Sequence, residues 1–366
     1  MIKLFEVTGF KNFHNTIPLD FSDIRDYKFN AQCITNDLIS KMLIYGKNSI
    51  GKSNFGLALF DIVSHLSSQN VTPGLYDYYL NASSLDDYAE FHYVFSFDQH
   101  LIDYRYRKDE KQALIYEKLV LDDALLYEYD YNKNRGNTEG IRNLAPTLNW
   151  AFQDLDCILK YMINNTVLDD SHPLRQMMRF VGNMLWFRSL DENRYMGYKS
   201  KSNDYYDYIF EGDNLAEFES FLHSAGIEEN LAAQTDVDGK QRLYFATDTP
   251  LPFFRVASNG TKALYNFFYW YKTAGDVSLM FIDEFDAFYH YELSESIVSI
   301  LEKMENTQVI ITSHNTNLLT NKIMRPDCYF ILTKDKLTSF ANATTRELRE
   351  GHNLDRCRTQ FKLVAD

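Results

Sequence analysis

The chain has 366 residues, 45% of them hydrophobic, which is enough for a large core and two structural units. Its net charge of −14 argues against broad, non-specific nucleic-acid binding, because such binding rests on Lys and Arg neutralising phosphates. The four cysteines lie far apart and form no C-x-x-C pair, so their spacing suggests neither a zinc site nor a disulfide framework.

The N-terminal part of the chain predicts strands. Residues 1–10 alternate like a strand rather than a signal peptide, and residues 17–21 form a second alternating run. Residues 42–45 are uniformly apolar, and the pattern from Ser53 to Leu66 is typical of a buried helix. No apolar run is long enough to span a bilayer, so we expect a cytoplasmic protein with no membrane partner.

The middle of the chain has a different character. Four alternating segments between residues 89 and 131 predict an antiparallel meander. Residues 148–187 and 214–226 are predicted to be helical, and 241–247 to form a strand. We expect this stretch, 67–252, to be an inserted subdomain made of the meander and the helices.

Strand and helix alternate again from residue 253. Helices are predicted after Ser258 and over 291–304, with strands at 277–282, 308–312 and 329–332. Such alternation is typical of a parallel sheet. The sequence therefore predicts an α/β fold in which 1–66 and 253–345 form one discontinuous nucleotide-binding domain, followed by a C-terminal tail at 346–366.

The first motif has the spacing G-x-x-x-x-G-K-S and lies between a predicted strand and a predicted helix. Its glycines let backbone N–H groups surround phosphates, and the helix N-terminus favours anions. Lys52 would reach the β- and γ-phosphates of a nucleotide, and the Ser53 hydroxyl would bind Mg²⁺. The expected nucleotide-binding residues are Gly46, Lys47, Asn48, Ser49, Ile50, Gly51, Lys52, Ser53 and Asn54.

The second motif is an apolar run, 279–282, that ends in two carboxylates. Asp283 is placed to hold Mg²⁺, and Glu284 to polarise the attacking water as a general base. Alone, this pattern is also typical of an ordinary strand that ends in a polar turn. Its combination with the first motif favours the catalytic interpretation.

Two further strand and helix ends are candidates for phosphate contacts. Ser258 is a good N-cap for the helix that follows, and a Ser beside Gly260 at a helix N-terminus can also bind phosphate. Ser313 and His314 end a buried strand, where an imidazole can hydrogen-bond a γ-phosphate. A lone His is more often structural, so only the position argues for His314.

Along the chain the motifs follow the order G-x-x-x-x-G-K-S, Ser258-x-Gly260, the apolar run with Asp283-Glu284, and Ser313-His314. This order resembles that of the ABC-type ATPase heads of the SMC, RecN and OLD class. Residues 10–13, with Lys11 and Asn12, resemble the family's early loop near the nucleotide, and Ser313-His314 resembles its H-loop. Asp286 and His290 resemble its D-loop. Residues 348–353 resemble the ending of short AAA-type bacterial defence ATPases of the RloA/AbiL kind.

The resemblance implies an ABC-type head, a mixed sheet flanked by helices, that binds ATP with Mg²⁺ and hydrolyses it slowly. It also implies a homodimer, or a higher even oligomer, with composite ATP sites. Lys52, Glu284 and His314 would be catalytic in one copy, beside the metal-binding Ser53 and Asp283. The residues that would reach across from the second copy are Ser258, Asn259, Gly260, Thr261 and Asp286. The signature differs from the transporter form L-S-G-G-Q, and no coiled-coil heptads are present.

Three functions are compatible with such a head. The first is an ATPase subunit of a bacterial anti-phage, abortive-infection system, which responds to a phage-derived trigger and controls a separate nuclease or toxin. The second is an OLD-like nuclease, disfavoured because only about thirty residues follow the last predicted strand, too few for a domain. The third is a DNA-repair or chromosome-maintenance ATPase, disfavoured by the acidic balance. Direct contact with DNA or RNA is left open by the sequence.

Overall fold

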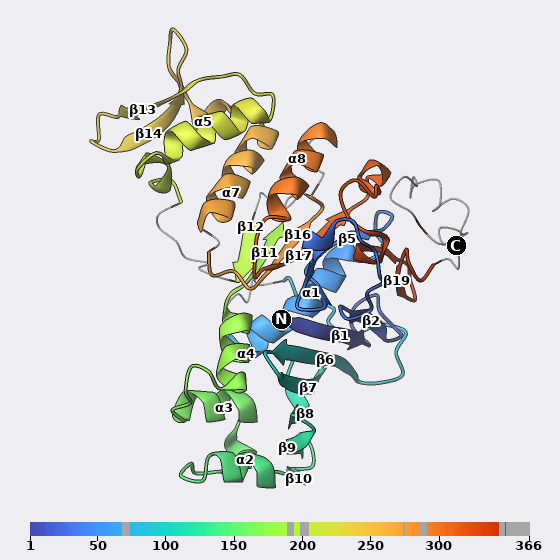
Figure 1. Cartoon of the computed structure of the whole chain (residues 1–366). Coiled ribbons are helices and arrows are strands. Elements are labelled where there is room, and N and C mark those ends of the chain that lie inside the picture. The colour runs from blue at the N-terminus through green and yellow to red at the C-terminus, as the bar shows by residue number, and fades with distance from the viewer. Residues whose placement is uncertain are drawn as a thin grey trace.

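The computed structural model describes residues 1–67, 74–188, 194–197, 205–273, 275–285, 291–343 and 348. Two seven-stranded sheets dominate it, one antiparallel and one mainly parallel (Figure 1). Among the helices in these ranges, none is both long and apolar enough to cross a membrane.

The antiparallel sheet has the strand order β10-β9-β8-β7-β6-β1-β2. Its strands are β1 (Ile2–Thr8), β2 (Ile17–Asp20), β6 (Tyr88–Phe97), β7 (His100–Asp109), β8 (Leu114–Leu121), β9 (Ala124–Asp130) and β10 (Arg135–Asn137). The predicted meander is therefore confirmed as β6–β9. It continues the N-terminal strands, because β6 pairs with β1 with Tyr93 opposite Phe5.

The second sheet has the order β12-β11-β16-β17-β5-β18-β19. Its strands are β5 (Lys41–Tyr45), β11 (Met184–Arg188), β12 (Arg194–Gly197), β16 (Leu279–Asp283), β17 (Gln308–Ser313), β18 (Tyr329–Leu332) and β19 (Leu337–Ser339). The five inner strands run parallel, and β12 and β19 pair antiparallel at the two edges. This confirms the α/β architecture and the parallel sheet expected from the sequence.

One predicted helix is partly wrong. Residues 184–187 belong to β11, which pairs parallel with β16 so that Met184 lies opposite Leu279. A short, wholly apolar run such as Met184 to Phe187 has no periodicity that separates a buried strand from a buried helix. The middle of the chain thus contributes a strand to the central sheet, while the boundaries of the expected domains stay a prediction.

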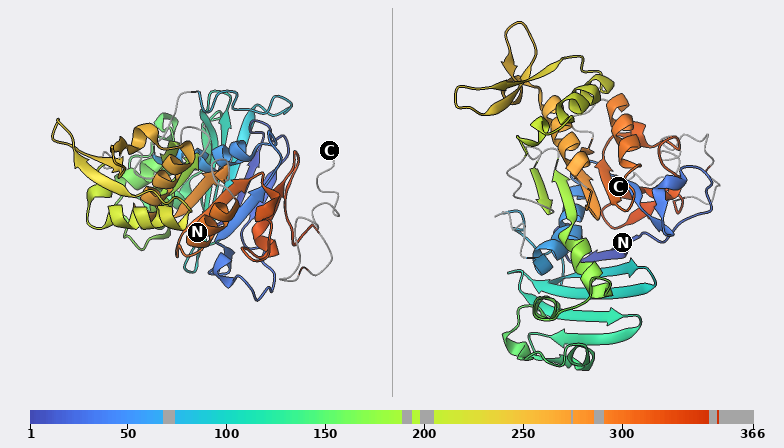
Figure 2. Two further views of the ribbon diagram at one scale, coloured as in Figure 1. Left: turned by 90° about the horizontal axis from the view of Figure 1, so that it is seen from above. Right: turned by 60° about the vertical axis from the view of Figure 1, so that its left-hand side comes forward.

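Helix α1 (Lys52–Ser67) lies between the two sheets (Figures 1 and 2). Its Phe55 ring lies 5.6 Å from that of Phe5 on β1, and its Phe60 ring lies 5.6 Å from that of Trp186 on β11. Most of its residues are buried, as expected for a helix that packs against a sheet on either side. The loop that precedes it is consequently held by both sheets.

The remaining helices cover the sheets. They are α2 (Glu139–Leu144), α3 (Ile158–Asn165), α4 (Pro173–Gly182), α5 (Asn214–Ser224), α6 (Phe253–Val256), α7 (Asn259–Thr273) and α8 (Tyr291–Leu301). Helices α2, α3 and α4 lie beside the meander, and α5 to α7 lie near a small sheet of β13 (Leu231–Thr235), β14 (Gln241–Phe245) and β15 (Leu251–Pro252) (Figure 1). A short hairpin of β3 (Ile34–Thr35) and β4 (Leu38–Ile39) precedes β5.

Candidate nucleotide-binding site

The carboxyl ends of β5, β17 and β16 meet at one edge of the central sheet. Ser313 lies opposite Tyr45 in the β17–β5 pair, and Ile311 lies opposite Ile282 in the β17–β16 pair. The glycine-rich loop and His314 follow two of these strands and Asp283 ends the third, so all three lie at the same edge, which is where open parallel sheets bind ligands.

The loop after β5 has the local geometry of a phosphate cradle. Gly51 has a φ of +107° and Ser49 a φ of +65°, so the chain turns sharply before α1 begins at Lys52. Lys47, Asn48 and Ser49 are exposed, whereas Lys52 is buried. The Lys52 Nζ donates to the carbonyl oxygens of Gly46 at 2.9 Å and Lys47 at 3.2 Å, so the ammonium lies against the loop.

Asn12 braces this loop from the N-terminal part of the chain. Its Nδ2 donates to the Ile50 carbonyl at 3.0 Å, and its Oδ1 accepts from Asn54 Nδ2 at 2.7 Å. The amide thereby joins the loop to the first turn of α1. The sequence predicted Asn12 near the nucleotide, and the structure places it against the backbone of the loop.

Lys11 points to a neighbouring loop. Its Nζ donates to the Asp77 carbonyl at 2.7 Å, and its own backbone, at a φ of +47°, donates to the Tyr79 carbonyl at 3.0 Å. Burial lowers the pKa of Lys11, and the nearby Asp77 carboxylate offsets part of that effect. The role of Lys11 toward a nucleotide stays a prediction.

The Asp283 carboxylate and the Glu284 backbone are held by a residue that the sequence analysis did not single out. Thr312, fully buried on β17, donates from Oγ1 to Asp283 Oδ1 at 2.7 Å and accepts from the Glu284 backbone N–H at 2.8 Å. Glu284 has a φ of +48°, a left-handed conformation that costs a non-glycine residue roughly 1–2 kcal/mol. The feature of the sequence that could have pointed to Thr312 is a polar residue that directly follows an apolar run, residues 309–311.

His314 lies directly after β17 and is exposed. The preceding residue, Ser313, accepts from the Gly46 N–H through its carbonyl at 3.3 Å, and its Oγ accepts from the Asn315 N–H at 2.8 Å. His314 is thus next to the start of the glycine-rich loop. The structure brings it to the same sheet edge as Lys52, Ser53, Asp283 and Glu284.

The signature residues lie elsewhere, at the start of α7. Ser258 Oγ accepts from the Thr261 N–H at 3.1 Å, which confirms Ser258 as the N-cap, and pairs with Thr261 Oγ1 at 2.8 Å. Ser258 and Asn259 are exposed, and Ser258, Gly260 and Thr261 border a cavity shared with residues 225–227 and with β14. Asp286, expected beside them across a dimer, lies outside the described residues, as does His290.

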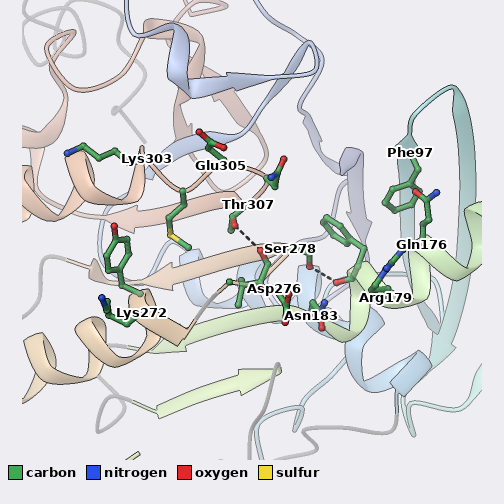
Figure 3. A pocket seen from close by; sticks show the side chains of 16 residues that line it. Phe97, Gln176, Arg179, Asn183, Lys272, Asp276, Ser278, Lys303, Glu305 and Thr307 are labelled. Carbon is green, nitrogen blue, oxygen red and sulfur yellow. Dashed lines mark hydrogen bonds between the residues drawn. The ribbon is translucent and has the colours of Figure 1, made fainter. Parts of the chain in front are cut away.

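A separate cavity of about 670 Å³ lies at the opposite edge of the central sheet (Figure 3). Ser278 and Thr307, which border it, immediately precede β16 and β17 and so mark the amino ends of these strands. Their hydroxyls donate to the carbonyls of Phe180 at 2.5 Å and Val277 at 2.8 Å. This cavity is therefore distinct from the candidate nucleotide site.

A strand, a G-x-x-x-x-G-K-S loop and a buried helix, with an acidic strand end on the same sheet edge, define a P-loop NTPase with an α/β fold. Residues 41–320 match the family described as "AAA domain, putative AbiEii toxin, Type IV TA system", and the chain belongs to this family of P-loop ATPases. No curated protein matches the chain.

Several solved structures are similar to the chain at low sequence identity. The SMC head domain from Thermotoga maritima is 13% identical, with 92% of this chain and 98% of that one covered and a TM-score of 0.46. An Smc head domain with a coiled coil and joint from Pyrococcus yayanosii is 10% identical, with 98% and 99% covered and a TM-score of 0.49. The recombination mediator RecF with ATP is 11% identical, with 93% and 99% covered and a TM-score of 0.41.

Proposed function

We propose that this chain is an ATP-binding, slowly hydrolysing ATPase subunit of a bacterial anti-phage defence system, and that a pair of copies controls a separate nuclease or toxin. The arrangement of Thr312, Asp283 and Glu284 beside the P-loop carries the ATPase part of the proposal. The defence part is supported by the description of the family, which names a toxin of a toxin–antitoxin system.

The residues at the sheet edge suit ATP with Mg²⁺. The carboxylate of Asp283 and the hydroxyl of Ser53 are hard oxygen donors of the kind that Mg²⁺ prefers. Bound Mg²⁺ would neutralise charge on the phosphates during transfer. The loop N–H groups and Lys52 would hold the phosphates, and Thr312 would fix the direction of both carboxylate-bearing residues.

Glu284 would act as the general base. Its backbone is fixed by the 2.8 Å hydrogen bond to Thr312, and its side chain is half-buried. A carboxylate can orient a water and take its proton when that water attacks the γ-phosphate. His314, at the end of the neighbouring strand, would contact the γ-phosphate from the other side.

A second copy would complete each site. The exposed signature residues Ser258 and Asn259 would face the ATP bound to the P-loop of a partner, so ATP binding closes the pair and hydrolysis opens it. The nucleotide would then serve as a latch between two copies, and the effector would respond to the closed or open state.

The ATPase proposal is tested with Glu284→Gln. Because the amide cannot accept the proton from water, we expect ATP turnover to fall at least about tenfold while ATP-dependent dimers accumulate in size-exclusion chromatography. Glu305→Gln serves as the control, because Glu305 is exposed at the opposite edge of the sheet. Wild-type turnover in Glu284→Gln would show that Glu284 is not the base.

The effector proposal is tested by co-purification with the product of the neighbouring gene, with and without ATP. We expect the amount of captured partner to change with ATP. A partner captured equally in both conditions, or none at all, would contradict nucleotide control of an effector. A nuclease assay on the isolated chain with Mg²⁺ or Mn²⁺ is expected to be negative, and a positive result would favour the OLD-like alternative.

A further inference from the structure

Three side chains with metal-binding atoms meet in the interior between α1, β8 and α3. They are His65 near the end of α1, Glu117 on β8 and Cys157 at the N-cap of α3. One donor atom from each lies within 4.8 Å of the other two. Glu117 is fully buried, Cys157 is buried and His65 is partly buried. None of these residues belongs to the candidate nucleotide site.

The distances between the donor atoms are those of a compact ligand set. Cys157 Sγ lies 3.4 Å from Glu117 Oε1 and 3.9 Å from His65 Nε2. The Tyr104 hydroxyl lies 2.7 Å from His65 Nε2 and 2.8 Å from Glu117 Oε1, and so offers its oxygen as a fourth donor atom beside them. Donor atoms with these separations can all lie at zinc–ligand distances of roughly 2.0–2.3 Å from one central ion.

We propose that His65, Glu117 and Cys157 bind one divalent transition-metal ion of the Zn²⁺ type. One imidazole nitrogen, one carboxylate oxygen and one thiolate sulfur are a mixed donor set that suits Zn²⁺ better than Mg²⁺ or Ca²⁺. A carboxylate and a thiolate together carry two negative charges, so a divalent ion leaves the buried cluster neutral. On binding, the Cys157 thiol loses its proton to solvent as the sulfur–metal bond forms.

The surroundings of Glu117 orient it for this role. Its oxygens accept from the hydroxyl of Tyr127, from that of Tyr131 at 2.6 Å and from the Ile158 N–H at 3.0 Å. These donors are uncharged, so they orient the carboxylate without cancelling its charge. Hydrogen bonds of this type fix the direction of metal-ligating carboxylates in proteins.

An entry path leads to the cluster from the surface. A cavity of about 420 Å³ is bordered by His65 and Cys157 and extends to Lys108, Gln112 and Lys160. An ion in this cavity would lie next to both the His65 and the Cys157 side chains. Once bound, it would join α1, which begins at the P-loop, to the meander and to α3.

The test is a Co²⁺ titration of the full chain after removal of metal with a chelator. We expect one equivalent to bind with a thiolate-to-cobalt charge-transfer absorption, and Zn²⁺ to displace it, because Zn²⁺ binds such sites more tightly. Cys157→Ser should abolish this absorption, and His65→Gln should weaken binding at least about tenfold. Cys33→Ser is the matched control, since Cys33 is also buried but lies outside the cluster.

X-ray absorption of the Zn²⁺-loaded wild type tests the proposal without depending on whether a variant folds. We expect one sulfur ligand together with nitrogen and oxygen ligands. Absence of the charge-transfer band, its survival in Cys157→Ser, or a zinc spectrum without sulfur would overturn the proposal. The cluster would then be a hydrogen-bonded network that only holds α3 on the meander.

Discussion

Gly51 and Asn12 show how single residues shape the P-loop. A Cβ built on Gly51 would lie 2.3 Å from Asn12 Nδ2, and the backbone there has a φ of +107°. A side chain is therefore excluded both by the backbone conformation and by the amide that holds the loop. The glycine of the motif is therefore favoured here by its contact with residue 12, in addition to the approach to phosphate that the motif predicts.

We predict that Gly51→Ala weakens ATP binding by roughly tenfold or more, because strain of about 1–3 kcal/mol must be relieved by moving the loop or Asn12. The measurement is the Kd of a fluorescent ATP analogue. Gly182→Ala is the control, since a Cβ on Gly182, at the end of α4, meets nothing within 4 Å. Equal affinities in the two variants would contradict this account of the loop.

His92 is a second residue whose surroundings have a measurable consequence. Its ring lies between Glu6, with Nδ1 2.7 Å from Oε2, and Asp103, with Nε2 3.0 Å from Oδ1. Burial lowers the pKa of His92, but the hydrogen bonds to Asp103 and Glu6 outweigh it and raise the pKa above 6.5. Protonated His92 therefore stabilises the pairing of β1, β6 and β7.

We predict that this contribution is fully present below about pH 6.5 and is lost as the pH rises through the raised pKa. His92→Gln should therefore reduce the free energy of unfolding more at about pH 6 than at about pH 9. Urea denaturation at both pH values measures the difference. The same measurement on His100→Gln, which removes an exposed histidine paired with Asp122, serves as the comparison. A loss that does not depend on pH would mean that His92 acts only by packing.

At the scale of elements, α1 is attached to the meander by a buried ion pair. Lys108 on β7 donates from Nζ to Asp61 Oδ2 at 2.6 Å and Oδ1 at 2.9 Å, and both side chains are buried. Tyr79 and Tyr106 also donate to the Asp61 carboxylate, at 2.8 Å and 3.1 Å. The helix that begins at the P-loop is thus fixed to the antiparallel sheet by polar as well as apolar contacts.

We predict that Asp61→Asn lowers the free energy of unfolding by about 3–5 kcal/mol, because it leaves the Lys108 charge buried without its partner. Lys108→Met combined with Asp61→Asn should recover part of that loss. Asp130→Asn, at a more exposed pair with Lys133, should cost at most about 1 kcal/mol. Urea denaturation compares the free energies of unfolding of the variants. Similar losses at both sites would show that the buried pair stabilises the fold no more than the other pair does.

At the scale of the whole molecule, the two halves of the proposed composite site lie in different places. The P-loop follows β5 in the central sheet, whereas Ser258 lies at the start of α7, beside the cavity that includes Phe245 of β14. ATP-dependent association would bring the two together between copies. Ionic contacts should contribute little to it, since each copy carries a net charge of −14.

We predict that Ser258→Asp keeps the N-cap of α7 but abolishes ATP-dependent dimers, because a carboxylate caps as well as a hydroxyl yet repels phosphate. ATP binding to the single chain should stay within about twofold of wild type. Mixing Ser258→Asp with Lys52→Ala should restore part of the ATPase activity, because one mixed site is then intact. Analytical ultracentrifugation and turnover of the mixture are the measurements. Dimers of Ser258→Asp with ATP would contradict the composite site.

The sequence alone determined those parts of the protein that depend on residues close together along the chain. The P-loop spacing, the alternating strands of the meander and the Ser258 cap each depend on neighbouring residues, and all were confirmed as elements. The order of strand, motif and helix was enough to predict an α/β P-loop protein.

Only the tertiary structure decided what depends on long-range packing. It assigned residues 184–187 to the central sheet, joined the meander to β1, and placed Thr312 between Asp283 and Glu284. It also brought Cys157 to His65 and Glu117, although the spacing of the cysteines suggested no metal site. A sheet can pair strands that are distant along the chain, so these contacts leave no periodic pattern in the sequence.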